Sequence, residues 1–200
     1  HMITDLGGHG IAAIYQGTNP GPTVLFRAEL DALPIHEISD NAHRSAYPGT
    51  GHLCGHDGHM TILMGLARIL FRQRPARGRV VLLFQPAEET GAGAQAVIAD
   101  PKFGSVSPDF AFSLHNMPGL PLGHIGLAEG PVNCASRGLR ATLSGKTAHA
   151  SEPENGTSPM AALCSLMPAL TALGHGTTRD ADFALVTVTH ASMGAAAFGV

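Results

Sequence analysis

Metal-ligand residue types are concentrated in one short stretch of the sequence, residues 51–59. It reads GHLCGHDGH and holds one thiol, one carboxylate and three imidazoles, which belong to His52, His56 and His59. Thiolate and imidazole suit zinc and other borderline-soft divalent metals. Cys54 and His56 would point about 200° apart on a helix, so a loop or an extended turn lets both reach one ion. The stretch predicts a metal site, against two plainer alternatives: a His-rich surface loop, or a buried cysteine beside hydrogen-bonded histidines.

Four other polar side chains share one feature, because each follows a predicted strand. They are Asp31 after 23–26, Glu88 and Glu89 after 79–84, and His115 after 109–114. Ligands of open α/β sheets bind at the carboxyl ends of strands. Taken singly, the two glutamates fit a solvated pair on the surface. The aspartate fits a turn cap, and the histidine fits a core residue whose hydrogen bonds are satisfied. Their joint placement with Cys54 and His56 favours a metal-hydrolase site.

The elements that must position these residues follow an α/β order. Strands are predicted at 11–15, 23–26, 79–84 and 109–114, and helices at 59–71 and 91–100. The run at 79–84 is continuous and apolar, which is typical of a strand buried on both faces of a parallel sheet. The order predicts an α/β domain with a mainly parallel sheet and flanking helices.

The pattern changes near residue 130, where Gly130 and Pro131 indicate a linker. Beyond it, strands are predicted at 134–144 and 183–190. A helix is predicted between them at 158–173, with a kink at Pro168. We therefore expect two domains, 1–130 and 131–200, of which the second is a smaller α+β domain.

Composition narrows the class of protein. The chain has 200 residues and a net charge of −3, so no nucleic-acid or membrane partner is indicated. Three widely spaced cysteines make no disulfide framework, which favours a reducing, cytoplasmic setting. There is no apolar run near the roughly 20 residues of a membrane span, and no signal-peptide pattern at the start. We expect the natural chain to continue at both ends.

Four ordered motifs carry a family resemblance: RAELDALP at 27–34, HLCGHDGH at 52–59, QPAEE at 85–89 and LHN at 114–116. In this order they resemble the dinuclear-metal amidohydrolases of the aminoacylase/carboxypeptidase family. The nearest branch is that of the hippurate hydrolases and the indole-acetyl-amino-acid hydrolases. The resemblance implies a partial catalytic domain at 1–130 and a partial lid, or dimerisation, domain at 131–200.

The resemblance also implies roles for individual residues. Metal ligands are expected at Cys54, His56, Glu89 and His115, and a general base at Glu88. They would hold two divalent ions, of zinc, manganese, nickel or cobalt, which polarise the scissile carbonyl and activate a shared water. The base would take that water's proton and pass it to the leaving amine.

Three more positions gain a meaning from the resemblance. Asp31 matches a carboxylate that orients ligands, and Glu29 stands where many relatives carry Asp. His149, in the motif GKTAHA, matches a residue that the partner subunit supplies to steady the oxyanion, although its plainer interpretation is an exposed loop imidazole. His59 and Asp57 are expected either behind the ligands or at the helix start.

The predicted function is hydrolysis of the amide bond of N-acyl or N-aroyl amino acids, by a homodimer formed through the lid domain. The alternative is a non-catalytic fragment that binds metal or dimerises. The family completes its site with one more histidine near its C-terminus, which lies beyond residue 200. We therefore expect the 200-residue chain alone to bind at most one metal tightly and to show no appreciable amidase activity.

Overall fold

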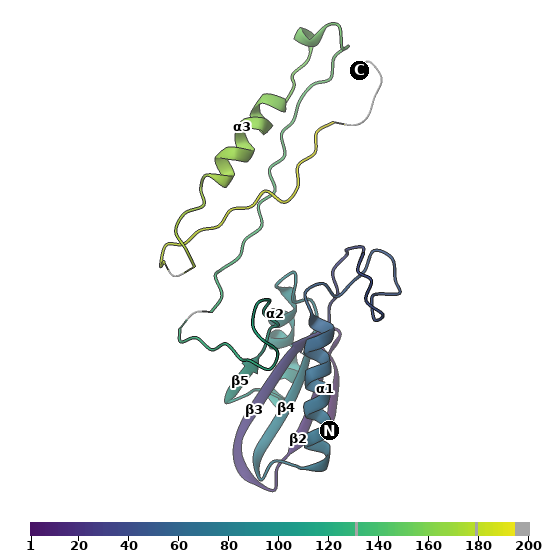
Figure 1. The fold of residues 1–200 in the computed structure, drawn as a ribbon, viewed down its shortest axis with the longest axis vertical. Helices are drawn as coiled ribbons and strands as arrows, with labels where there is room; N and C mark the ends of the chain where they lie inside the picture. The colour runs from purple at the N-terminus through teal and green to yellow at the C-terminus, as the bar shows by residue number, and fades with distance from the viewer. Residues whose placement is uncertain (131, 179, 195–200) are drawn as a thin grey trace. The chain divides into compact units, whose positions relative to one another are not determined.

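The computed structural model describes residues 1–130, 132–178 and 180–194 (Figure 1). Its internal contacts divide the chain into two compact units, His1–Leu127 and Ala128–Val200. We treat each unit separately. The assignment of the two parts to a catalytic and a lid domain stays a prediction.

The first unit is built on a five-stranded sheet. Its strands are β1 (Met2–Leu6), β2 (Gly10–Gln16), β3 (Asn19–Glu29), β4 (Arg77–Gln85) and β5 (Phe110–Ser113), in the spatial order β1-β2-β4-β3-β5. β3 pairs in parallel with β4 and β5, whereas β2 pairs antiparallel with β1 and β4. The sheet is therefore mixed, and the expectation of a mainly parallel sheet is not confirmed.

Connection length explains the mixture. β3 and β4 are joined through a helix, which gives enough chain for a parallel crossover. β1, which the sequence analysis missed, is joined to β2 by only three residues, and such a short turn permits only an antiparallel pair. Its pattern of apolar and polar residues is too short to indicate a strand by itself.

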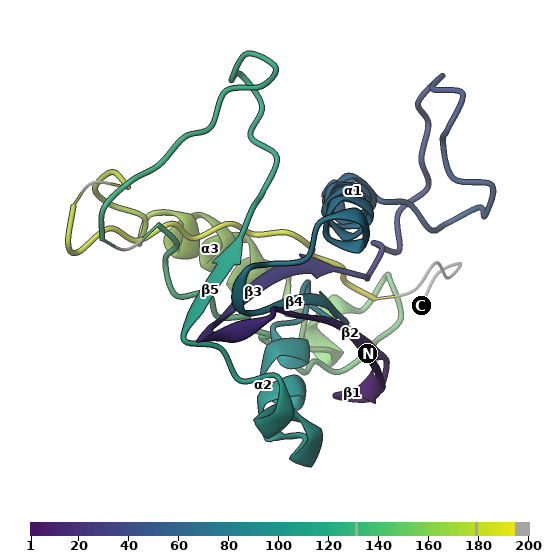
Figure 2. The same cartoon turned by 90° about the horizontal axis from the view of Figure 1, so that it is seen from below.

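Two helices cover the sheet on opposite faces, α1 (His56–Arg72) and α2 (Ala92–Ala99) (Figure 2). Leu63 and Leu70 of α1 pack with Leu82 and Phe84 of β4 on one face. On the other face, Val97 of α2 belongs to a second apolar cluster. A short 3-10 helix, η1 (Pro101–Ser105), then leads toward β5. β4 is thus buried on both faces, as its sequence predicted.

β5 is an exposed edge strand. Phe110 and Phe112 expose more than half of their surface, although the ring of Phe112 stacks on Phe26 of β3 with ring centroids 5.5 Å apart. The strand is only four residues long and pairs on one side only, with β3. Its importance is positional, because it delivers residues 114–116 to the edge where β3 and β4 also end.

The second unit contains α3 (Met160–Thr171), with Pro168 inside it, and a 3-10 turn, η2 (Pro153–Asn155). The strands expected at 134–144 and 183–190 are wrong, because neither of these described segments forms a strand ladder. Two isolated bridges, Lys146–Thr157 and His175–Ala184, are the β pairings of this unit in the described residues. Alternating apolar residues make a strand only when a neighbouring strand takes up their backbone groups.

Among the residues that the structure describes, no helix combines the length and the apolar character needed to cross a bilayer.

Candidate metal centre

A tight turn followed by a helix start positions the first two candidate ligands. Cys54 lies in the turn, and Gly55 takes the left-handed φ of 88° that lets the chain enter α1 at His56. The sequence predicted the helix from 59, so it begins three residues earlier than expected. His56 and His59 therefore both lie on its first turn, and both are 1% exposed.

His56 is oriented by the chain that follows β3. Its Nδ1 lies 2.8 Å from the backbone oxygen of Asp31, and because a carbonyl only accepts, Nδ1 carries the proton. Its Nε2 is buried and has no hydrogen-bond partner. This atom lies 3.7 Å from Oε2 of Glu88 and 3.9 Å from Oε1 of Glu89. A buried lone pair aimed at two carboxylates is the arrangement that a bound cation would complete.

The turn after β4 presents the two glutamates. Ala87 has a φ of 48°, which is uncommon for a residue with a side chain, and its carbonyl accepts from Gly93 N–H at 3.0 Å. The N–H of Glu89 donates to Oδ2 of Asp31 at 3.0 Å. Burial alone would raise the pKa of Asp31, but hydrogen bonds from the backbone of Glu89 and Glu88 bring it below its ordinary value. The ionised carboxylate of Asp31 thus links the chain after β3 to the turn after β4 by a hydrogen bond.

Cys54 and His115 meet from the turn and from the end of β5. Sγ of Cys54 lies 3.4 Å from Nε2 of His115, whose Nδ1 donates to the carbonyl oxygen of Asn116 at 2.8 Å. Burial raises the pKa of the Cys54 thiol to about 11, together with the hydrogen bond and charge of Glu89 and the charge of Glu88. A cation at this place would act in the opposite sense and favour the thiolate.

The donor atoms are close enough to share ions. Ligand atoms of Cys54, His56 and His115 lie within 4.8 Å of one another, and so do those of His56, Glu88 and Glu89. Thiol, imidazole and carboxylate groups together fit a borderline divalent metal, and the partnerless Nε2 of His56 fits it as well. The structure thus brings together the residues that the sequence placed at the carboxyl ends of three strands.

His149 belongs to the second unit and is described with that unit. Its side chain is exposed, and its Nδ1 lies 2.8 Å from the hydroxyl oxygen of Ser151. The role that the resemblance implies for it stays a prediction.

Glu29 and His59 form the most deeply buried polar pair of the candidate site, and the sequence did not predict that these two residues meet. Glu29, the last residue of β3, and His59 are both 1% exposed, and Oε2 of Glu29 lies 2.8 Å from Nδ1 of His59. A signal was present, because His56 and His59 are three apart and share one helix face. The spacing of the apolar residues at 59–71 predicted a helix start at 59, so the sequence did not indicate that both histidines lie on the first turn of the helix.

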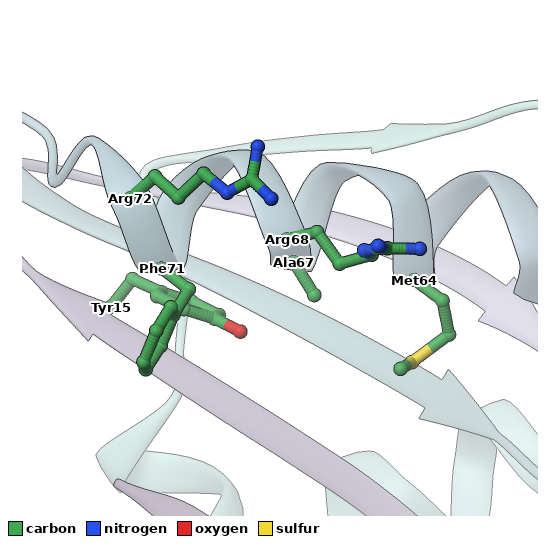
Figure 3. A pocket seen from close by; sticks show the side chains of 6 residues that line it. All are labelled: Tyr15, Met64, Ala67, Arg68, Phe71 and Arg72. Atoms are coloured by element: carbon green, nitrogen blue, oxygen red, sulfur yellow. The ribbon is translucent and has the colours of Figure 1, made fainter.

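Two hollows lie on the first unit. One of about 420 Å³ borders the candidate metal centre at Asp31 and Glu89, between apolar walls that include Leu33 and Pro86. The other, of about 390 Å³, lies between α1 and β2 (Figure 3). Its lining consists of Tyr15, Met64, Ala67, Arg68, Phe71 and Arg72. This second lining offers neither a carboxylate nor a thiol or imidazole ligand, so it does not compete as a metal site.

Comparison with known proteins decides the family. The model of peptidase family M20/M25/M40 matches residues 25–199. The chain belongs to this family. It is 37% identical over 180 residues to N-acetyl-L-cysteine deacetylase of Bacillus subtilis (strain 168), covering 90% of this chain and 43% of that protein. It is 39% identical over 169 residues to IAA-amino acid hydrolase ILR1-like 5 of Arabidopsis thaliana, covering 84% of this chain and 38% of that one.

A solved structure agrees with this family. The YXEP protein of Bacillus subtilis, described as a dinuclear metal binding peptidase from the M20 family, superposes with a TM-score of 0.59 at 38% identity. The match covers 66% of this chain and 37% of that one. This M20-family chain thus spans less than half the length of the relatives it matches. The resemblance that the four sequence motifs carry is confirmed at the level of the family.

Proposed function

We propose that the whole protein is a metal-dependent amidohydrolase that cleaves the amide bond of N-acyl or N-aroyl amino acids and releases a carboxylic acid and a free amino acid. The names of two relatives support this substrate class, since one is an N-acetyl-L-cysteine deacetylase and the other an IAA-amino acid hydrolase. The choice of acyl group and amino acid is left open.

One observation carries the proposal. Nε2 of His56 is buried, has no hydrogen-bond partner, and faces the carboxylates of Glu88 and Glu89. Leaving a buried acceptor unpaired costs about 1–3 kcal/mol, so such an atom calls for an explanation. A metal ion between the imidazole and a carboxylate supplies one.

We assign Cys54, His56, Glu89 and His115 as the ligands that this chain contributes. Two ions are proposed because the similar YXEP structure is described as dinuclear. Bound divalent ions would polarise the substrate carbonyl and lower the pKa of a water molecule. Zinc, manganese, nickel and cobalt all tolerate this mixture of donors.

Glu88 is proposed as the general base. It shares the turn with Glu89, but its carboxylate is the more exposed of the two, at 38% against 28%, and so more open to substrate and water. It accepts the proton of the attacking water and returns it to the leaving amine. Asp31 holds the turn in place through the N–H of Glu89 and orients His56 through its own carbonyl.

His149 and the dimer belong to the same proposal. We propose that the second unit joins two copies of the protein and that His149 of one copy steadies the oxyanion at the site of the other. A cytoplasmic location likewise stays a prediction.

The test is hydrolysis by the whole protein. Metal is removed with a chelator, then zinc, manganese, nickel and cobalt are restored separately, and release of free amino acid from hippurate and from N-acetyl amino acids is measured. We expect activity that vanishes with the metal and returns with at least one ion. Metal binding without hydrolysis of any of these substrates would contradict the proposal and favour a metal-binding module.

A further inference from the structure

A buried pair lies behind the proposed ligands. Glu29 ends β3 and His59 lies on the first turn of α1, and each is 1% exposed. His59 Nδ1 lies 2.8 Å from Oε2 of Glu29. Buried charged residues are rare unless they are paired, so this pair has a function in structure or in positioning.

Glu29 is fixed from its other side as well. Its Oε1 accepts from the guanidinium of Arg27, which also donates through Nε to Oε1 of Gln85 at 2.9 Å. Burial alone would raise the pKa of Glu29, but the hydrogen bond with His59 and the charge of Arg27 bring it below its ordinary value. Glu29 is therefore an ionised acceptor at neutral pH.

The second nitrogen of His59 reaches the end of β5. The backbone N–H of Asn116 donates to Nε2 of His59 at 3.0 Å. Because an amide N–H only donates, Nε2 carries the lone pair, and the proton of the neutral ring lies on Nδ1, facing Glu29. Oδ1 of Asn116 also lies 3.0 Å from Nε2, but it shares no hydrogen bond with a nitrogen that carries a lone pair, because both atoms accept. Both ring nitrogens of His59 are thus occupied.

Asn116 in turn contacts both His115 and the turn that carries Cys54 and His56. Its carbonyl oxygen accepts from Nδ1 of His115, which turns Nε2 of His115 toward Cys54. Its side chain lies over Gly55, where a Cβ would come within 2.5 Å of Oδ1. Gly55 is the link between Cys54 and His56, so one asparagine contacts the turn that carries two ligands and orients the third.

We infer that Glu29 and His59 are positioning residues that hold Asn116, and that Asn116 sets the mutual placement of Cys54, His56 and His115. The inference deepens the proposed function and rests on it for the presence of a metal. An alternative is that Glu29 and His59 bind metal themselves, since their donor atoms lie within 4.8 Å of His56. Two observations argue against this alternative. Both ring nitrogens of His59 already have hydrogen-bond partners, and the two carboxylate oxygens of Glu29 already have partners in His59 and Arg27.

Cobalt binding to the 200-residue chain tests the inference without any hydrolysis. Co²⁺ is titrated into the chain while thiolate-to-cobalt charge-transfer absorption and the visible ligand-field bands are followed. Loss of an outer partner of a metal ligand costs about 10–100-fold in affinity. We expect this loss, and altered visible bands, for His59→Leu, which removes the acceptor of the Asn116 N–H. Asn116→Ala keeps both backbone hydrogen bonds of Asn116 and removes only the side chain over Gly55, so it should weaken binding less. Glu29→Gln keeps an acceptor oxygen facing His59, so it should bind Co²⁺ more tightly than Glu29→Leu.

A control separates positioning from general stability. Leu63 is buried one turn further along α1, in the apolar cluster against β4, so Leu63→Val should lower the melting temperature and leave the cobalt spectrum unchanged. Folding of every variant is checked by circular dichroism. Asn116 is exposed and Gly55 lies in the turn before α1, so substitutions at these two positions keep the test available even where a change at His59 prevents folding.

A double substitution tests the contact over Gly55. Gly55→Ala brings a clash with Asn116 and strain at a positive φ, and Asn116→Ala removes only the clash. Gly55→Ala should therefore weaken Co²⁺ binding less in the Asn116→Ala background than in the unaltered chain.

Two results would overturn the inference. One is wild-type Co²⁺ affinity and spectrum in a folded His59→Leu variant, or a Gly55→Ala loss that the Asn116→Ala background does not reduce. The other is failure of the unaltered chain to bind Co²⁺ through its thiol, because the pair would then have no ligands to position. Failure of the proposed function would appear elsewhere, in the hydrolysis assay of the whole protein.

Discussion

Cys54 is the one thiol among the imidazole and carboxylate donors of the proposed site. In the metal-free chain its proton is held tightly, because burial and the nearby Glu89 and Glu88 raise the pKa of the thiol to about 11. A metal that binds the thiolate must displace that proton. Affinity is therefore coupled to pH through this residue.

We predict that Co²⁺ affinity rises by about tenfold per pH unit between about pH 7 and pH 9, since the thiol releases one proton for each ion bound. The direction follows from the raised pKa, because removing the proton costs less as the pH approaches 11. Titrations at several pH values measure the slope. Cys54→Ala serves as the control and should have almost none. Equal slopes in the two proteins would show that the thiol is not a ligand.

The neighbouring glutamates should differ in the whole protein. Glu88→Gln should keep metal and lower turnover by about 10²–10⁴-fold, the usual contribution of a general base. Glu89→Gln should also lose metal affinity, because it removes a ligand charge. Turnover is measured on an N-acyl amino acid and metal content by atomic absorption. Near-normal turnover in Glu88→Gln would refute its assignment as the base.

At the residue scale, the sequence indicated the candidate site residues that follow strands and turns better than the buried pair of Glu29 and His59. Asp31, Cys54, Glu89 and His115 could be predicted because each follows a strand or a tight turn, where polar groups stand out. Glu29 could not, because its partner is 30 positions away and its burial follows from the packing of α1 on the sheet.

Among the elements, α2 packs closely against the turn after β4, which carries Glu88 and Glu89. Gly93 of α2 is so close that an added Cβ would lie 1.6 Å from the carbonyl oxygen of Pro86. The N–H of Gly93 also donates to the carbonyl of Ala87. This close approach fixes where the chain goes after β4, and with it the position of Glu88 and Glu89.

We predict that Gly93→Ala lowers the free energy of unfolding by about 1–3 kcal/mol, as overpacking does in other cores, and weakens Co²⁺ binding because the turn must shift. Gly65 supplies the matched control, since it lies in α1 with open space where its Cβ would be. Gly65→Ala should stabilise the protein by about 0.5–1 kcal/mol through helix propensity. Chemical denaturation gives both values. If Gly93→Ala proved as harmless as Gly65→Ala, the close packing of α2 would be wrong.

The elements of the first unit were largely predictable and those of the second were not. The apolar run of β4 and the spacing of Leu63, Leu66 and Leu70 in α1 each identify one element by a strong local pattern. The segments 134–144 and 183–190 alternate only in part, and strand formation depends on a partner that a local pattern does not reveal.

For the whole molecule, the second unit leaves much apolar surface uncovered. No residue of α3 is buried, and Leu139 and Leu185 are 79% and 76% exposed. Large exposed apolar groups of this kind mark surfaces that associate. This exposed apolar surface is the physical basis for the proposed dimer through the second unit.

We predict that the chain associates through this unit at tens of micromolar, about the range in which weak dimers are detected. Replacing Leu139 and Leu185 together by Asp should shift the sedimentation coefficient toward that of a monomer. Leu122→Asp, at a fully exposed leucine of the first unit, should leave it unchanged. A monomeric wild-type chain in sedimentation velocity would dispose of the proposed dimer.

We propose that three strand ends and one helix start of this chain build a metal site with a thiolate ligand. X-ray absorption spectroscopy of the zinc-loaded chain detects such a ligand. We expect a sulfur at about 2.3 Å from zinc, beside nitrogen and oxygen ligands at about 2.0–2.2 Å. The sulfur should be lost in Cys54→Ser and kept in Cys134→Ser and Cys164→Ser. A zinc ion without sulfur in the wild-type chain, or with sulfur that survives Cys54→Ser, would contradict the account.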